Sequence, residues 1–426
     1  MNKLKILSIL FLLLTGIVRG QQVPVVISNA TIHVGDGSVI NNGMVIFKNG
    51  KLTYVGINKE SGYDENTASL IDGTGKHVYP GLIGIAAELG LIEITAVRST
   101  RDAYEVGVFN PNIRSLIAYN TDSKVIPTLR SNGILLAQVV PGGGVISGQS
   151  SIMKLSGWNW EDAVVATDKG MHMQWPEAYG YNYFTETYEL SKTYLKEVTD
   201  IYNFVQEAKA YCSITEHKEK NLRFEAMRKV FTRDQKMFIN ANSAKSIIGA
   251  VEFGKKFGVQ IVIVGGMQSY RVIDLLKENN IPIILETTHE LPQMSGDPVD
   301  LVYKLPSILT RAGIFCGLTI SNGGDSYWNL RNLPFVAGSA AAYGLTTEEA
   351  LQLITSNNAK ILGIDTDYGT LTEGKSATLF VSTGDALDMK TSVLTNIFIN
   401  GERIKVENWQ DELSKKYEIK YGIEVR

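Results

Sequence analysis

Apolar residues along the central part of the chain follow two alternating patterns. Short runs of consecutive apolar residues alternate with longer stretches in which apolar residues recur at helical spacing. The runs predict strands at 78–83, 134–140, 237–241, 260–264, 281–285 and 315–320. The stretches 243–257, 270–277 and 346–361 predict helices with one apolar face. This alternation is typical of repeated βα units and predicts an α/β fold, a (β/α)8 TIM barrel.

The pattern does not place the third and fourth barrel strands. The segment 150–155 is one candidate for a strand. The segment 182–233 is predicted to be mostly helical and is rich in Tyr, Lys and Glu, so we expect it on the outside of the barrel.

Short alternating runs at both ends of the chain predict a second, smaller domain. Runs at 23–30, 44–47 and 52–55 are separated by Gly-rich and Asn-Gly turns, and similar runs return at 378–381, 393–400 and 403–406. We therefore expect the two terminal segments to form one composite β-sandwich beside the barrel.

The first 20 residues have the layout of a secretory signal. Lys3 and Lys5 precede an apolar run that ends near Val18, and this run is too short to span a bilayer as a helix. A cut after Gly20 predicts an exported protein, periplasmic or secreted, with no membrane span left after signal removal. The predicted organisation is a signal peptide at 1–20, β-sandwich halves at 21–78 and 365–406, a barrel at 79–364 and a tail at 407–426.

The composition argues against nucleic-acid binding and shows that histidine and cysteine are scarce. With 41 basic and 44 acidic side chains the chain has no electrostatic footprint for nucleic acid. Only five histidines and two cysteines are present. Cys212 and Cys316 are interpreted as buried thiols, and no CxxC or CxxH spacing offers a sulfur site for zinc.

Three segments carry a resemblance to a known family. They are GTGKHVYPGLI at 73–83, TTEEALQLITSNNAKILGI at 346–364 and GTLTEGKSATL at 369–379. In this order they resemble the amidohydrolase superfamily, and most closely its imidazolonepropionase-like branch. The resemblance implies a hydrolase of C–N bonds other than peptide bonds, such as those of cyclic amides or acyl-dipeptides. It also implies a zinc-type site at the C-terminal ends of the barrel strands.

Residue by residue, the family's metal positions are changed in this chain. The HxH pair after strand one becomes Ala86 and Glu88, the histidine of strand five becomes Asn240, and that of strand six becomes Gly265. The aspartate of strand eight becomes Asn322. Alanine and glycine have no side-chain ligand, and amide oxygens are weak zinc ligands. We therefore expect no cofactor, unless a remodelled site holds zinc or another divalent metal.

A few polar residues on the predicted rim are candidates for a remodelled site. His289 follows strand seven and Asp325 follows a two-glycine loop, so with Glu88 they form the candidate catalytic set. Glu286, Asn240 and Asn322 are candidates for the substrate pocket. The other histidines are expected to be packed or at the surface: His33, His77, His172 and His217. The glycines at 142–144 are interpreted as a loop, because no Lys-Ser/Thr follows them.

Three hypotheses about function stay open at this point. The first is an exported C–N hydrolase with a remodelled site. The second is a catalytically silent member that pairs with an active amidohydrolase relative or with itself. The third is a barrel that binds a ligand without reaction, since a fold does not fix a function.

Overall fold

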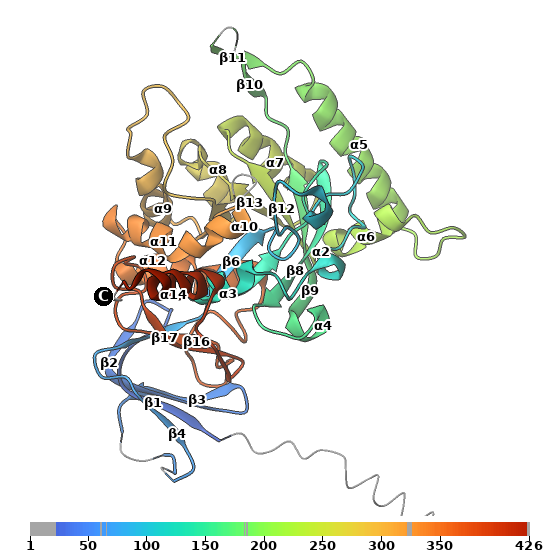
Figure 1. The fold of residues 1–426 in the computed structure, drawn as a ribbon. Coiled ribbons are helices and arrows are strands. Elements are labelled where there is room, and N and C mark those ends of the chain that lie inside the picture. Colours follow the sequence, from blue (N-terminus) through green and yellow to red (C-terminus); the bar gives the residue numbers. More distant parts are fainter. Residues whose placement is uncertain are drawn as a thin grey trace, which may run out of the picture.

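A computed structural model describes residues 23–59, 62–64, 66–182, 184, 186–321 and 326–423. The chain forms a barrel and a smaller β domain beneath it (Figure 1). The predicted signal peptide and the candidates Asn322 and Asp325 lie outside the described residues. Among the described helices, none has the length and apolar character needed to cross a bilayer. Cys212 and Cys316 are both free thiols, and Cys316 is buried as expected, whereas Cys212 is only partly buried.

The β domain is built from both ends of the chain, as the sequence predicts. Its strands are β1 (Val25–His33), β2 (Val39–Lys48), β3 (Lys51–Ile57), β4 (Ser69–Asp72), β5 (His77–Pro80), β16 (Leu379–Ser382), β17 (Leu394–Ile399) and β18 (Glu402–Ile404). β5 pairs with β1 on one side and with β16 on the other. The expected sandwich is one continuous sheet that encloses its own core, where the rings of Phe47 and Phe398 meet edge to face at 4.8 Å.

The predicted strand at 78–83 is two strands, one in each domain. β5 belongs to the β domain, and β6 (Leu82–Ala87) begins the barrel after Gly81. A Cβ atom at Gly81 would lie 2.9 Å from Leu135 Cβ and 2.9 Å from Thr378 Cγ2. The chain changes sheets at Gly81 because only glycine fits this close approach.

The barrel sheet follows the order of the chain. After β6 come β7 (Ile134–Val139), β8 (Ile146–Lys154), β9 (Val164–Gln174), β12 (Lys236–Ala241), β13 (Ile261–Gly265), β14 (Ile283–Leu285) and β15 (Cys316–Leu318). β8 runs antiparallel to both neighbours, whereas the other adjacent pairs are parallel. The third strand therefore departs from the expected βα repeat, because the short connection at 140–145 turns it back beside β7.

A seam remains between the first and last strands of the barrel, which are not hydrogen-bonded as neighbours in the sheet. Side chains bridge it. Thr319 Oγ1 accepts from the amide of Ile85 at 3.2 Å, and it also donates to the carbonyl of that residue. Asn358 Nδ2 donates to the carbonyls of Ile83 at 2.8 Å and Leu318 at 3.0 Å. The barrel is closed here by two side chains.

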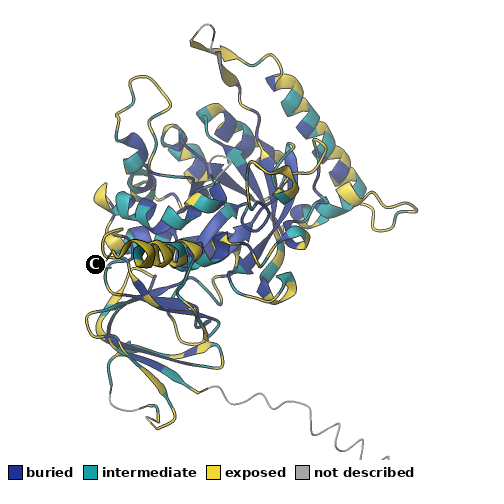
Figure 2. Cartoon of the chain, in the orientation of Figure 1, coloured by how far each residue is buried: buried dark blue, intermediate teal, exposed yellow. Residues whose placement is uncertain are grey.

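Helices surround the strands, and the buried residues concentrate in the barrel sheet (Figure 2). The helices are α2 (Ser115–Ala118), α3 (Val125–Arg130), α4 (Trp160–Ala163), α5 (Tyr194–Cys212), α6 (Leu222–Phe231), α7 (Ala244–Phe257), α8 (Ile273–Glu278), α9 (Leu301–Arg311), α10 (Ser326–Asn329), α11 (Leu333–Ala342), α12 (Thr347–Leu353), α13 (Ser356–Leu362) and α14 (Trp409–Tyr421), with 3₁₀ turns η1 (Arg98–Thr100), η2 (Ser269–Arg271) and η3 (Leu330–Asn332). The predicted helix at 346–361 breaks at Thr355, whose backbone is not helical and whose hydroxyl donates to the Leu351 carbonyl.

Two parts of the chain lie outside the barrel (Figure 1). The hairpin β10 (Tyr179–Asn182) and β11 (Thr187–Leu190) leads into α5 and α6, where the sequence predicts an external helical excursion. The C-terminal tail contains α14, a helix with no buried residue. It is held against α3 by the bond from the Thr128 hydroxyl to Gln410 Oε1 at 2.8 Å.

Candidate functional site

A polar cavity of about 240 Å³ opens at the mouth of the barrel, at the C-terminal ends of β6, β7, β9 and β12. We call it the mouth cavity. Its lining residues are Ala86, Glu88, Tyr104, Val140, Pro141, Gly142, Gly143, Ser147, His172, Met173, Gln174, Asn240, Ser321 and Ser326. Three positions singled out in the sequence, 86, 88 and 240, therefore meet in one cavity.

The end of β6 departs from regular strand geometry. Ala86 has a left-handed backbone, with φ of 54°, and the pairing with β7 is irregular between Gly84 and Ala87. Alternate residues of a regular strand point the same way, and this bulge changes that alternation. Glu88 Oε2 accepts a hydrogen bond from the Tyr104 hydroxyl at 3.3 Å. Burial raises the pKa of Glu88, against the opposing effects of Tyr104 and Arg101.

The end of β13 is filled by a side chain from its neighbour. Gly265 has φ of +95°, and a Cβ atom there would lie 2.3 Å from Asn242 Oδ1. This oxygen also accepts from the amide of Met267 at 3.3 Å. A larger residue at Gly265 would be strained by the backbone and would collide with Asn242. Asn242 has no signal in the sequence, because its contact crosses from β12 to β13.

A buried acid lies behind the mouth cavity. Glu286 is nearly fully buried after β14, and Ser321 donates its hydroxyl proton to Glu286 Oε1 at 2.6 Å. Burial raises the pKa of Glu286, and the charge of Glu290 adds to this, whereas the hydrogen bonds from Ser321 and Asn242 lower it. Glu286 is not part of the cavity lining, but it positions Ser321, which is.

His172 is the histidine that the structure places in the mouth cavity. Its Nε2 lies 2.8 Å from Ser150 Oγ, which accepts from Gln138 Nε2 at 2.9 Å. Gln138 Oε1 in turn accepts from the amide of Ala86 at 3.3 Å, so the chain of hydrogen bonds crosses from β9 to β6. Burial lowers the pKa of His172 to about 3, and its imidazole is neutral at physiological pH.

The role of His172 could not be found without placing β9. The sequence predicts a packed or surface histidine there. A weak signal exists, since Met171 and Met173 are apolar on either side, as expected for a strand with His172 on the opposite face.

His289 is at the rim but turns away from the mouth cavity. Its Nε2 lies 2.5 Å from Ser339 Oγ on α11, and its ring lies 5.9 Å from that of Tyr303 on α9. It is not part of the lining that holds Glu88. The structure therefore does not bring His289 and Glu88 together, and Asp325, the third candidate, is outside the described residues.

Residues 187–406, just over half of the chain, match the sequence pattern of the amidohydrolase family. The chain belongs to the amidohydrolase family. An amidohydrolase from Thermotoga maritima MSB8 has a similar structure, with a TM-score of 0.78 and 25% identity over 89% of this chain and 99% of that one. A prolidase complexed with N-methylphosphonate-L-proline shares the fold alone, with a TM-score of 0.56 and 16% identity over 90% of this chain and 99% of that one.

A curated relative agrees with the resemblance found in the sequence. Imidazolonepropionase of Flavobacterium psychrophilum is 26% identical over 179 residues, which are 36% of this chain and 43% of that protein. The chain spans less than half the length of the curated relatives that it matches.

The metal that the amidohydrolase family implies does not fit the residues described. Among the positions that the family resemblance marks, Ala86 and Gly265 offer no side-chain donor, Asn240 offers an amide, and Glu88 is a single carboxyl group whose pKa is raised by burial. Within the described part of the chain no three His, Cys, Asp or Glu side chains cluster as a metal site would require.

Proposed function

We propose that this chain is an exported member of the amidohydrolase family in which metal-dependent hydrolysis of C–N bonds is lost. Its barrel mouth is kept as a binding cavity for a small uncharged ligand. The family background is the hydrolysis of non-peptide C–N bonds, as in cyclic amides or acyl-dipeptides. The chain therefore still binds ligands of this kind but no longer hydrolyses them.

The observation that carries the proposal is the contact between Gly265 and Asn242. A histidine at position 265 would need space that Asn242 Oδ1 occupies, 2.3 Å from the required Cβ atom. The site is therefore repacked around the changed residue. Zinc lowers the pKa of bound water from about 15.7 to about 7, and no hydrogen bond from an amide replaces that effect.

The lining of the mouth cavity indicates the class of ligand. His172 is neutral, and burial raises the pKa of Glu88, so this cavity disfavours charge. The other polar side chains carry amides or hydroxyls, and they are Gln174, Asn240, Tyr104, Ser147, Ser321 and Ser326. Such groups recognise donors and acceptors without a charge. At about 240 Å³ the cavity is small, so the ligand is a compact amide, comparable to a single ring or one amino-acid residue.

Two measurements on the purified protein test this proposal together. Elemental analysis should find less than about a tenth of an equivalent of zinc, manganese, iron or nickel. Assays with cyclic amides and acyl-dipeptides should show no turnover, whereas some of these amides should raise the melting temperature. Stoichiometric metal together with turnover that is lost in Glu88→Gln would overturn the proposal. If none of the amides raises the melting temperature, only the binding part of the proposal is contradicted.

Export is a separate part of the proposal and has its own test. It rests on the basic start, the short apolar run and the small residues before position 21. N-terminal sequencing of the protein recovered from the periplasm or the medium should begin at Gln21. A product that keeps Met1 inside the cell would contradict export.

An observation at the rim favours a second candidate, a silent partner of an active relative or of a second copy. The loop that carries Tyr104 also exposes Val106 and Val108, which are 90% and 56% exposed, and Leu291 on another rim loop is 77% exposed. Exposed apolar residues at a cavity entrance are typical of contact surfaces. Light scattering of the purified chain, alone and mixed with a metal-containing relative, distinguishes a monomer from either assembly.

A further inference from the structure

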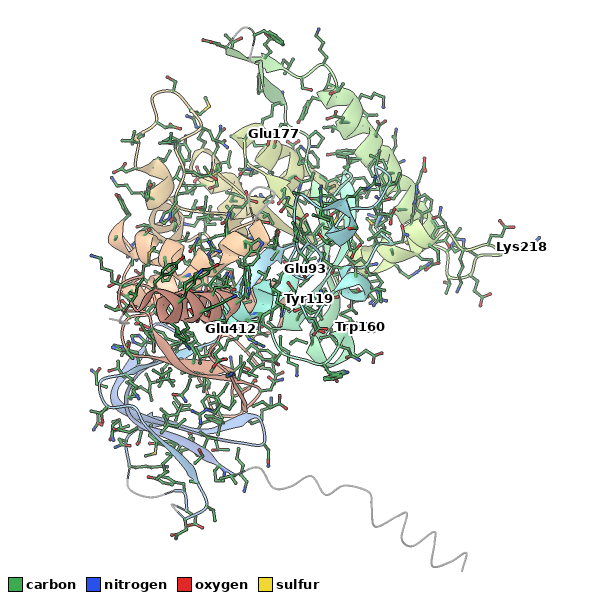
Figure 3. The ribbon with its side chains drawn as sticks, viewed as in Figure 1. Glu93, Tyr119, Trp160, Glu177, Lys218 and Glu412 are labelled. Atoms are coloured by element: carbon green, nitrogen blue, oxygen red, sulfur yellow. The ribbon has the colours of Figure 1, made fainter. Side chains whose placement is uncertain are left out.

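A second, smaller cavity lies at the opposite end of β7 from the mouth. Lys154 pairs with Leu136 near the start of that strand, and the Leu155 amide donates to Leu135. The cavity has a volume of about 30 Å³ and is partly open to solvent. We call it the basal cavity, and its lining residues are Tyr119, Thr121, Ile126, Arg130, Lys154, Leu155, Ser156 and Gly157. Figure 3 shows the labelled Tyr119 on this side of the barrel.

The basal cavity holds two cationic side chains and no acid. Arg130 ends α3 and Lys154 ends β8, and neither forms a salt bridge with any residue that the structure describes. No Asp or Glu is among the lining residues. The charge of Glu93 acts on the Tyr119 hydroxyl, but no carboxylate charge contributes to the environment of Arg130. This is unusual in a chain whose net charge is −3.

Arg130 is only partly satisfied by the protein. Its Nη1 donates to the carbonyl of Leu155 at 3.0 Å. Its Nε is buried and has no hydrogen-bond partner, and the same holds for the nearby Ser156 hydroxyl. Burial lowers the pKa of Arg130 below its usual value. Arginine stays protonated in proteins, so the partly buried guanidinium of Arg130 remains a charge, and its buried Nε still lacks a partner.

The donors around this cavity match one class of ligand. Arg130 Nε, the Lys154 ammonium and the hydroxyls of Ser156 and Tyr119 all carry protons that an acceptor-only group can receive. A planar guanidinium beside an ammonium is the typical arrangement for phosphate and carboxylate groups. The volume is about that of two water positions, so only a small ion enters, with part of it exposed to solvent.

We propose that the basal cavity is a binding site for a small oxyanion, supplied as inorganic phosphate or sulfate or as a carboxylate. The oxyanion accepts hydrogen bonds from Arg130 and Ser156 and is neutralised by Lys154. The site is independent of the mouth cavity, and its function does not depend on whether the protein hydrolyses anything. It ties the end of α3 to the end of β8 through the bound ion.

Calorimetry and thermal unfolding of the purified protein test this site. Sulfate, phosphate and acetate are each compared with sodium chloride at equal ionic strength, which removes the general effect of screening. We expect at least one oxyanion to bind with one-to-one stoichiometry and to raise the melting temperature, whereas chloride does neither. Strong binding of sulfate and phosphate indicates a tetrahedral ion, and equal or stronger binding of acetate indicates a carboxylate source.

Three variants within the site and one control variant elsewhere separate the site from nonspecific effects. Lys154→Met should weaken oxyanion binding about tenfold, as expected for a lost charge-assisted hydrogen bond, and Ser156→Ala should weaken it about threefold. Lys255→Met on α7 removes an exposed cation elsewhere and should change nothing. Arg130→Lys keeps the charge and removes Nε, so it reports on geometry if it folds. Equal responses to chloride and oxyanions, or unchanged binding in both Lys154→Met and Ser156→Ala, would overturn the proposal.

Discussion

The mouth cavity and the basal cavity differ in how they treat buried charge. At the mouth, burial raises the pKa of Glu88 and lowers that of His172, so both groups tend toward their neutral forms. At the basal cavity, Arg130 and Lys154 are cations without an acidic partner among the lining residues. Burial therefore shifts the pKa values at the mouth toward the neutral forms, whereas the cations of the basal cavity have no acidic partner among its lining residues.

The difference follows from the side chains themselves. A carboxyl group or an imidazole can change its protonation within the range of ordinary pH, whereas a guanidinium cannot. The groups at the mouth can therefore lose their charge by taking up or releasing a proton, whereas the basal cavity needs an ion. Polarity alone does not determine what a cavity binds, because one polar cavity can favour an uncharged ligand and another an anion.

The largest expected effect comes from restoring the family histidine at the mouth. Gly265→His combines a left-handed backbone with a collision at Asn242, and we expect it to lower the free energy of unfolding by about 4 kcal/mol. Urea unfolding measures this loss. The matched control is Gly374→His, where φ is +86° and nothing lies within 4 Å of the added Cβ atom.

The control should lose only the backbone part, about 1–2 kcal/mol. Adding Asn242→Gly to Gly265→His should recover part of the loss, since it empties the space that the histidine needs. Equal losses at positions 265 and 374 would show that Asn242 does not fill the space beside Gly265.

An intermediate effect on stability is expected at low pH, where His172 would have to be protonated inside the mouth cavity. The pKa of His172 is about 3 in the folded chain against 6.5 ordinarily, so the unfolded chain binds a proton first as pH falls below 6.5. Stability is then lost by about 1.4 kcal/mol per pH unit, or roughly 3 kcal/mol by pH 4. Urea unfolding from pH 7 to pH 4 measures the slope.

His172→Gln keeps a polar partner for Ser150 and cannot titrate, so its stability should fall less steeply over the same range. His217→Gln is the control, because His217 stacks on Tyr211 outside the mouth cavity. A slope in His172→Gln as steep as in the unchanged protein would contradict a neutral His172.

The smallest effect is expected for Glu88→Gln, which makes the neutral form permanent. The amide oxygen still accepts from Tyr104, so stability at pH 4 should change by no more than about 0.5 kcal/mol. Because the folded pKa of Glu88 is raised, the acid costs stability as pH rises above its ordinary value.

The variant should therefore match the unchanged protein at pH 4 and equal or exceed its stability at pH 8. Unfolding curves at the two pH values give the comparison, with Glu402→Gln on the exposed strand β18 as the control. A clear loss of stability at pH 8 would mean that the mouth needs the charge of Glu88.

The sequence predicts the bounds of the mostly apolar strands well, whereas it finds only the second half of β8, through the candidate segment 150–155, and does not predict β9. β13 and β12 begin and end within one residue of the expected bounds, because their apolar runs reflect burial on both faces. β8 is different, since Gln149, Ser150 and Ser151 are all buried. Their burial depends on partners such as Gln138 and His172 on neighbouring strands, and no local pattern shows those contacts.

The candidate site divides in the same way. Positions 86, 88 and 240 are found from the sequence because the family resemblance marks them, and the mouth cavity confirms that they meet. Asn242 and His172 are missed because their importance comes from contacts between strands. A sequence indicates where a strand ends more readily than it indicates which side chains of the neighbouring strands contact that end.

The seam between β6 and β15 has a consequence for how the chain is made. The side chains that close it come from Thr319 and Asn358, far along the sequence from the strand that they meet. On the ribosome, the edge of β6 stays uncovered until more than three quarters of the chain has been synthesised, and the β domain waits even longer for β16. The barrel therefore closes late in biosynthesis. Until then the edge of β6 is exposed, and factors that bind the nascent chain would have to protect it.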